Sequence, residues 1–184
     1  FLDIKCPAAG ISPDAIILVV TTKALKYNGG VAKENVKEPN LEALKIGMAN
    51  LKRHIKNLRS YGAPVIVTVN RYNTDIRDET NYILDNMVSG VPVVLCDSFA
   101  RGGEGAKWLA RTVIDEIEDN ARKMLIHPYN SEDTDIMKKM YQLSTSIYGA
   151  KNVEYSEQAI KMIDKIKSMG YAGLPICVAK TQYS

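Results

Sequence analysis

The sequence predicts an α/β fold in which helices cover both faces of a mainly parallel sheet. Three short runs of apolar, largely β-branched residues, at 15–21, 64–69 and 91–96, are typical of strands buried on both faces. The segments between these runs carry apolar residues at helical spacing. Because strands and helices alternate along the chain, we expect right-handed crossovers between parallel strands.

The first strand is followed by a long connection and then a long helix. Residues 22–40 contain Asn28-Gly29-Gly30, and connections of this length in compact domains are usually functional loops or disordered segments. Asn40 is expected to cap the helix, which ends at Gly62. One apolar stripe runs along it: Leu41, Leu44, Met48, Leu51, Ile55 and Leu58. A coiled-coil seam is the alternative, but the stripe is short and flanked by strands, which favours packing on the sheet.

The other two connections of this region are predicted to be helical as well. Thr74 is the predicted N-cap of a helix that extends to Gly90 after the second strand. Gly102-Gly103 follows the third strand and precedes a helix that is expected to extend to about Lys123. The order strand, helix, strand, helix, strand, helix therefore extends over the first two thirds of the chain.

The last third has a different pattern and is expected to be a separate lobe. We predict a larger α/β domain over 1–126 and a smaller α/β lobe over 127–184, truncated at its end. The lobe is expected to contain a strand near 153–155, a helix over 156–169 and a strand over 175–179. The chain begins within an apparent element and stops directly after this last strand, so we expect both ends to be internal to a longer protein.

Composition excludes several classes of protein. The 184 residues are 46% hydrophobic and 24% charged, which is ordinary for a globular protein, and the net charge of +3 is spread along helices, so no nucleic-acid partner is expected. No apolar run approaches the roughly 20 residues that cross a bilayer, and no signal peptide is apparent, so we expect a cytoplasmic protein without membrane contact. Cys6, Cys96 and Cys177 are odd in number and widely spaced, which favours reduced core thiols.

Candidate ligand contacts follow each of the three strands, where open parallel sheets bind their ligands. After the first strand, Lys23 and Lys26 with Gly29-Gly30 are candidate contacts for an anion. After the second, the Asn70 amide could bind the edge of a heterocycle, because it both donates and accepts hydrogen bonds. These residues define a predicted crevice at one edge of the sheet.

Two aromatic residues lie just beyond neighbouring strands in the sequence, and a planar ring could stack between them. Tyr72 follows the second strand and Phe99 the third, while Gly102-Gly103 would let the backbone approach a ligand closely. The alternative remains that the two rings only cover the end of the sheet and that the glycines only make turns.

Several catalytic signatures are missing from the sequence. No G-x-x-x-x-G-K-[ST] motif is present, and 102–108 lacks both its spacing and its hydroxyl. G-x-S-x-G and H-E-x-x-H are absent too, and His54 and His127 are too few and too far apart to suggest a triad or a metal site. The sequence therefore assigns no catalytic residue and no metal ligand.

Several motifs, in order along the whole chain, resemble those of the formate–tetrahydrofolate ligase family. They are Phe1-Leu2-Asp3-Ile4-Lys5-Cys6 (F-x-x-I-K-C), Ala24-Leu25-Lys26 with Gly29-Gly30 (R-A-L-K-x-x-G-G), Asn70-Arg71-Tyr72 with Thr74-Asp75 (N-R-F-x-T-D), the 99–105 segment (W-A-x-G-G-x-G), Ile147-Tyr148-Gly149-Ala150 and Leu174 to Ser184. This sequence has Lys23 where the family usually has Arg, Pro7 where Arg is common, and Phe99 where it has Trp.

The resemblance implies a fragment of an enzyme. Members use ATP to phosphorylate formate and transfer the formyl group from formyl phosphate to N10 of tetrahydrofolate. It implies a P-loop NTPase-like core whose P-loop lies upstream of Phe1, so ATP and Mg²⁺ would be bound mainly outside this chain and the chain alone is expected to be inactive. It also implies a monovalent-cation response and a homotetramer. The substrates would be ATP, formate and tetrahydrofolate.

By the same resemblance, the residues after the second and third strands form the folate slot. Tyr72 and Phe99 would stack on the pteridine and Gly102-Gly103 would line the slot, with Asn70 and Arg71 beside them. Lys180, Thr181 and Gln182 match a family signature whose contacts the sequence does not assign. The alternatives are an inactive homologue or binding fragment of the same fold, and a different P-loop-type ligase; a G-x-x-x-x-G-K-T motif upstream would favour the formate–tetrahydrofolate ligase.

Overall fold

The computed structural model describes residues 1–120, 125–127 and 129–179, which fall into two compact units. The sheet unit consists of the described residues of Pro13–Met124. The helical unit combines Phe1–Ser12 with the described residues of Leu125–Ser184. The expected division into a domain over 1–126 and a lobe over 127–184 stays a prediction.

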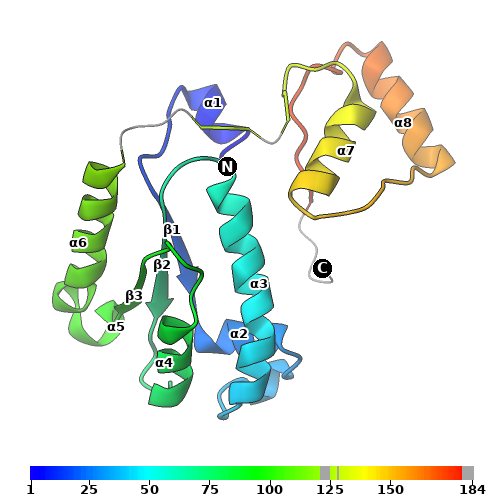
Figure 1. Cartoon of the computed structure of the whole chain (residues 1–184). Helices are drawn as coiled ribbons and strands as arrows, with labels where there is room; N and C mark the ends of the chain where they lie inside the picture. Colours follow the sequence, from blue (N-terminus) through cyan, green and yellow to red (C-terminus); the bar gives the residue numbers. More distant parts are fainter. Residues whose placement is uncertain (121–124, 128, 180–184) are drawn as a thin grey trace. The chain divides into compact units, whose positions relative to one another are not determined.

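The sheet unit contains three parallel strands in the order β1-β2-β3 (Figure 1). They are β1 (Ile16–Val20), β2 (Val65–Asn70) and β3 (Val93–Cys96). All three coincide with the apolar runs of the sequence, so the prediction of an α/β fold with a parallel sheet is confirmed. The strands are rich in Val and Ile, as is typical of parallel sheets whose two faces are covered by helices.

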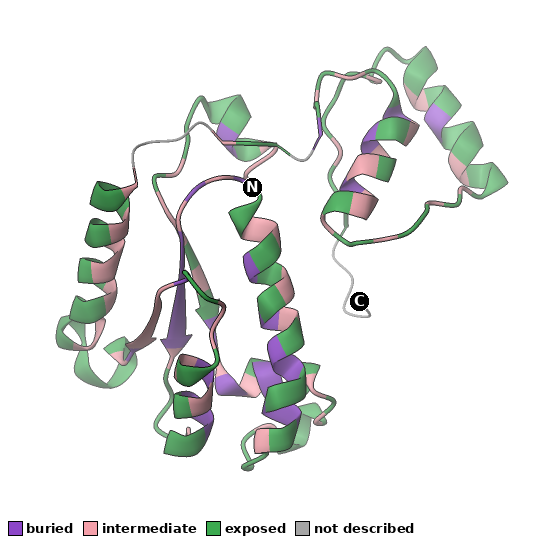
Figure 2. Ribbon diagram, in the orientation of Figure 1, coloured by how far each residue is buried: buried purple, intermediate pink, exposed green. Residues whose placement is uncertain are grey.

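The main core lies between one face of the sheet and the helices α3 (Leu41–Arg59) and α4 (Arg77–Asp85). The parallel register aligns Leu18, Val67 and Val93 on this face. The predicted stripe of α3 is buried against it, as Figure 2 shows for β2 and the inner side of α3. The Asn40 side chain accepts a hydrogen bond from the Ala43 N–H at 2.9 Å, which confirms it as the cap of α3.

On the other side of the sheet, α6 (Gly103–Asp119) covers β3 and β2, and the short α5 (Ser98–Arg101) precedes it (Figure 1). Ile66 and Thr68 of β2 are buried on this face, whereas Ile17 and Val19 of β1 are 45% and 59% exposed. Helices therefore lie on both faces of the sheet. On the α6 face, however, β2 and β3 are covered and β1 is exposed.

Two expectations about the helix starts are wrong. Residues 22–40 do not form an irregular loop throughout, because α2 (Thr22–Asn28) begins directly after β1 and a 3-10 turn (Lys33–Asn35) follows. The Thr21 hydroxyl caps α2 by accepting from the Ala24 N–H at 3.1 Å. The helix after β2 begins at Arg77, not after Thr74, because a backbone hydrogen bond from Asp75 N–H to the Tyr72 carbonyl closes a turn there first.

The helical unit contains α1 (Lys5–Ala9), α7 (Ile136–Ser146) and α8 (Glu157–Ser168). The strands expected at 153–155 and 175–179 are wrong, because within the part of this unit that the structure describes no segment pairs with either. A strand needs a hydrogen-bonded neighbour, so these segments are loops. The predicted helix end at Lys123 lies outside the described residues.

The segment before 175–179 is held by a buried ammonium group. The Lys139 side chain of α7 is fully buried, and Nζ donates hydrogen bonds to the carbonyls of Ala172 at 2.8 Å and Leu174 at 2.7 Å. All three cysteines are free, but Cys177 is exposed and is therefore not a core thiol as expected. None of the helices that the structure describes is both long and apolar enough to span a bilayer.

Candidate functional site

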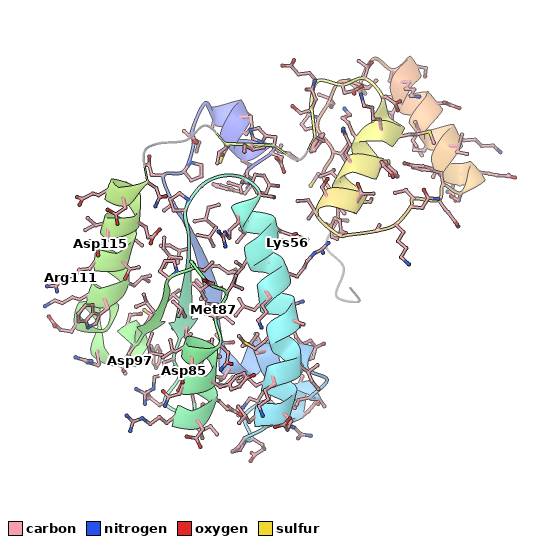
Figure 3. All side chains as sticks on the ribbon, viewed as in Figure 1. Lys56, Asp85, Met87, Asp97, Arg111 and Asp115 are labelled. Carbon is pink, nitrogen blue, oxygen red and sulfur yellow. The ribbon has the colours of Figure 1, made fainter. Side chains whose placement is uncertain are left out.

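Three segments meet the carboxyl ends of the strands in the sheet unit, at the lower edge of the sheet in Figure 1. They are the start of α2 after β1, the loop 71–76 after β2, and 97–105 after β3, where Figure 3 labels Asp97. Because the strands are parallel and adjacent, these segments share one edge of the sheet. Residues from all three segments therefore lie along the same edge of the sheet.

The loop after β2 is held by the carboxylate of Asp75. Its Oδ2 accepts from the backbone N–H of Tyr72 at 2.8 Å, and its Oδ1 accepts from the Thr22 hydroxyl, also at 2.8 Å. The Asp75 N–H in turn donates to the Tyr72 carbonyl at 2.9 Å. Thr22 is fully buried at the start of α2, so Asp75 ties the loop after β2 to a rigid position after β1.

Lys23 and Tyr72, both predicted site residues, are in contact. Nζ of Lys23 lies 4.1 Å from the centroid of the Tyr72 ring, within the range of a cation–π interaction. The Tyr72 side chain remains 38% exposed. The Lys23 ammonium group therefore lies over one face of the Tyr72 ring, and its positive charge is close to the carboxyl ends of the strands.

The expectation that Lys26 contacts an anion is not supported by its surroundings. Lys26 is 3% exposed, and Nζ donates at 2.9 Å to Glu79 Oε2, itself 1% exposed, and at 2.9 Å to the Glu38 carbonyl. Glu79 Oε1 accepts from the Asn40 N–H at 2.7 Å. Lys26 is thus neutralised inside the protein, where it joins α2, α4 and the start of α3.

Gly29 is likewise used for packing. A Cβ on Gly29 would lie 1.8 Å from the Ala43 carbonyl oxygen of α3, and one on Gly47 would lie 1.9 Å from the Leu25 carbonyl oxygen of α2. These two glycines let α2 and α3 cross in backbone contact. Gly30, with φ +97°, meets nothing within 4 Å and makes the turn.

The loop after β3 carries Phe99, which is 81% exposed on α5. Gly102 has φ +55° and ψ −141°, a conformation that favours glycine, and a Cβ on Gly103 would meet nothing within 4 Å. A Cβ on Gly105 would lie 2.2 Å from the Asp97 carbonyl oxygen, so this glycine is required by packing. The open space at Gly103 leaves room beside the Phe99 loop.

Asn70 and Arg71 lie between the two loops. Asn70 ends β2 beside Cys96, and the Arg71 N–H continues the ladder by donating to the Cys96 carbonyl at 3.0 Å. An Arg71 guanidinium nitrogen lies 3.8 Å from Asp97 Oδ2 in a partly exposed pair. Asn70 is therefore the last residue of β2 and Arg71 the first after it, so both lie at the carboxyl edge of the sheet.

The structure brings some of the predicted residues together and leaves others apart. Lys23 contacts Tyr72, and Arg71 pairs with Asp97, but within the described residues Tyr72 and Phe99 make no ring contact with each other. Lys180, Thr181 and Gln182 lie outside the described residues. No group of three or more potential metal ligands occurs in the described part of the chain.

Sequence reasoning missed the two residues that organise this site, Thr22 and Asp75. The available signal was local: an Asp shortly after Tyr72 is the residue type that closes turns through its side chain. The bond from Asp75 to Thr22 joins residues 53 positions apart, which no local pattern shows.

The chain is an α/β protein whose open parallel sheet carries aromatic, amide and cationic side chains at its carboxyl edge, the edge where open parallel sheets commonly bind small ligands. The chain belongs to the formate–tetrahydrofolate ligase family, whose model matches residues 1–184. Three proteins named formate–tetrahydrofolate ligase are similar over the whole chain: those of Phocaeicola vulgatus and Campylobacter curvus, each 44% identical, and that of Bacteroides thetaiotaomicron, 40% identical. The chain covers 33% of each, so it spans about a third of the length of these relatives.

Proposed function

We propose that this chain supplies the folate slot of an ATP-dependent ligase that formylates tetrahydrofolate at N10 with formate, through formyl phosphate. The observation that carries the proposal is the match to formate–tetrahydrofolate ligases over all residues of the chain. The slot consists of Tyr72, Phe99, Gly102 and Gly103, with Asn70 and Arg71 at its edge. The position of these residues at the carboxyl ends of β2 and β3 supports it.

In this proposal the chain binds and orients the acceptor of the formyl group. The pteridine would stack on Tyr72 and Phe99, gaining about 0.5–1.5 kcal/mol per stacked face beyond area burial. The Asn70 amide would hydrogen-bond the edge of the heterocycle, and Arg71 would supply positive charge beside it, while Lys23 would lie over the other face of the Tyr72 ring. Holding tetrahydrofolate in one orientation brings N10 to the acyl donor and removes the entropic cost of that encounter from the reaction.

The described residues do not fit a binding site for the nucleotide's phosphates or for Mg²⁺. The sequence has no phosphate-binding G-x-x-x-x-G-K-[ST] loop, and Lys26, the best buried cation near the strand ends, is already paired with Glu79. ATP and Mg²⁺ would be held by other parts of the P-loop NTPase-like protein, which we propose to be a cytoplasmic homo-oligomer. We therefore derive no step of the phosphoryl transfer from this chain.

The proposal is tested by kinetics of the full-length protein that carries this chain. It should form 10-formyltetrahydrofolate and ADP only when formate, tetrahydrofolate and ATP are all present, and Tyr72→Ala should raise the KM for tetrahydrofolate about tenfold or more with little change in that for ATP. The separate 184-residue chain should form no ADP. A full-length protein without this activity would be the inactive homologue and would refute the proposal.

A further inference from the structure

Asp75 is the residue on which the geometry of the Tyr72 loop depends. Its two carboxylate oxygens accept from different partners, the Thr22 hydroxyl and the Tyr72 backbone N–H, each at 2.8 Å. Hydrogen bonds to an ionised carboxylate are about twice as strong as neutral ones. One side chain therefore joins the segments that follow two neighbouring strands.

The partner on the β1 side is rigid. Thr22 is fully buried as the first residue of α2, and α2 packs in backbone contact with α3 through Gly29 and Gly47. The buried pair of Lys26 and Glu79 further joins α2 to α4, the helix that follows the Tyr72 loop. Asp75 therefore connects Tyr72 to a support that cannot shift without disturbing the core.

The same arrangement fixes which face of the Tyr72 ring is open. Lys23 follows Thr22 in α2, and its Nζ lies 4.1 Å from the Tyr72 ring centroid. Because Asp75 holds the backbone of Tyr72 against Thr22, it also holds the ring against Lys23. A ligand ring could then stack only on the opposite face, with the cation behind the tyrosine.

We propose that Asp75 is a positioning residue that holds Tyr72 against Lys23 and so presents one face of the tyrosine ring to the pteridine. This inference rests on the proposed folate slot. Asp75 itself does not touch the substrate. It keeps the Tyr72 loop ordered in the free protein, so the free energy of binding does not include the cost of ordering that loop.

Two variants remove the bridge from opposite sides. Asp75→Ala removes both acceptor oxygens, whereas an Asn there could still accept from the Tyr72 N–H and donate to the Thr22 hydroxyl. Thr22→Val keeps the shape and removes the donor. In the full-length protein each should raise the KM for tetrahydrofolate about tenfold, leaving kcat and the KM for ATP within about twofold. The double variant should be no worse than Asp75→Ala, because both changes break the same bond.

Asp78→Ala is the matched control. Asp78 is an exposed carboxylate in the first turn of α4, so this variant should change neither kcat nor either KM.

A readout without ligand separates this inference from the proposed function. In the full-length protein with ¹³C-labelled lysine, the ε-methylene of Lys23 should show an upfield ring-current shift from Tyr72. This shift should remain in Tyr72→Phe, which keeps a ring, and should be lost in Tyr72→Ala and in Asp75→Ala. A shift retained in Asp75→Ala, or a shift lost with no change in the KM for tetrahydrofolate, would overturn the positioning role. If Tyr72→Ala leaves the KM for tetrahydrofolate unchanged, the folate slot itself is wrong, and the Lys23 shift still decides whether Asp75 holds the ring.

Discussion

The two aromatic residues of the candidate site lie on loops that are held very differently. Tyr72 is 38% exposed, its N–H is bound by Asp75, and Lys23 covers one face of its ring. Phe99 is 81% exposed on a single helical turn whose N-cap makes no side-chain hydrogen bond. The Tyr72 ring is thus held by contacts within the chain, whereas the exposed Phe99 side chain is held by few, so fixing Phe99 against a ligand would cost more side-chain entropy.

The buried pair of Lys26 and Glu79 supports the Tyr72 loop, and breaking it should cause the largest loss of stability. Lys26→Met leaves the buried Glu79 carboxylate without its cation, and removing one partner of a buried pair typically costs about 3–5 kcal/mol. Urea unfolding of the 184-residue chain measures this loss. Lys26→Met/Glu79→Leu should recover part of it, because no charge is then left buried. Lys107→Met, which breaks an exposed pair with Glu104 on the Phe99 side, is the control and should unfold like the unmodified chain. Equal losses for Lys26→Met and Lys107→Met would show that the two sides are not held differently.

On the Phe99 side, Gly105 packs closely against the backbone of Asp97, and substitution of this glycine should cause the next largest loss of stability. Gly105→Ala places a Cβ 2.2 Å from the Asp97 carbonyl oxygen, so the start of α6 must move, at a cost of about 1–3 kcal/mol. Gly103→Ala meets open space and should leave the melting temperature unchanged or slightly higher. Thermal melting of both variants measures the difference. If Gly103→Ala were as destabilising as Gly105→Ala, the loop would be packed where the structure shows room.

Phe99 itself should have the smallest effect on stability. Because its side chain is largely exposed, Phe99→Ala should change the free energy of unfolding by no more than about 0.5 kcal/mol. Phe99→Trp should hold or tighten folate binding in the full-length protein, since the larger ring adds contact area. Unfolding curves and folate titrations of both variants check this. A Phe99→Ala variant that unfolds much more readily would mean that the ring only covers the end of the sheet.

The sequence predicted the parts of the fold that local patterns determine. The three strands are buried on at least one face and β-branched, so their runs were visible, and Asn40 caps α3 as expected because capping depends on residues three positions apart. The strand expected over 175–179 is absent because an apolar run becomes a strand only beside a partner, which the run itself does not reveal.

The sequence indicated which residues lie at the carboxyl edge of the sheet, but not the hydrogen bonds and ion pairs among them. Tyr72, Arg71 and Lys23 lie at the sheet edge as expected, because strand ends in a parallel sheet share one edge. Lys26 was misassigned because its partner Glu79 is 53 positions away, the same separation that hid the bond between Thr22 and Asp75. Long-range pairs of polar residues decide which cations are buried, and no short motif contains both partners.

If Tyr72 and Phe99 stack on the two faces of one pteridine ring, calorimetric titration of the full-length protein should show it. Tyr72→Ala and Phe99→Ala should each weaken tetrahydrofolate binding by about 1–3 kcal/mol, by analogy with bases stacked on aromatic side chains, while ATP binding and the melting temperature stay nearly unchanged. If either variant instead loses affinity for tetrahydrofolate and ATP equally, together with its thermal stability, the rings serve the fold and the account is contradicted.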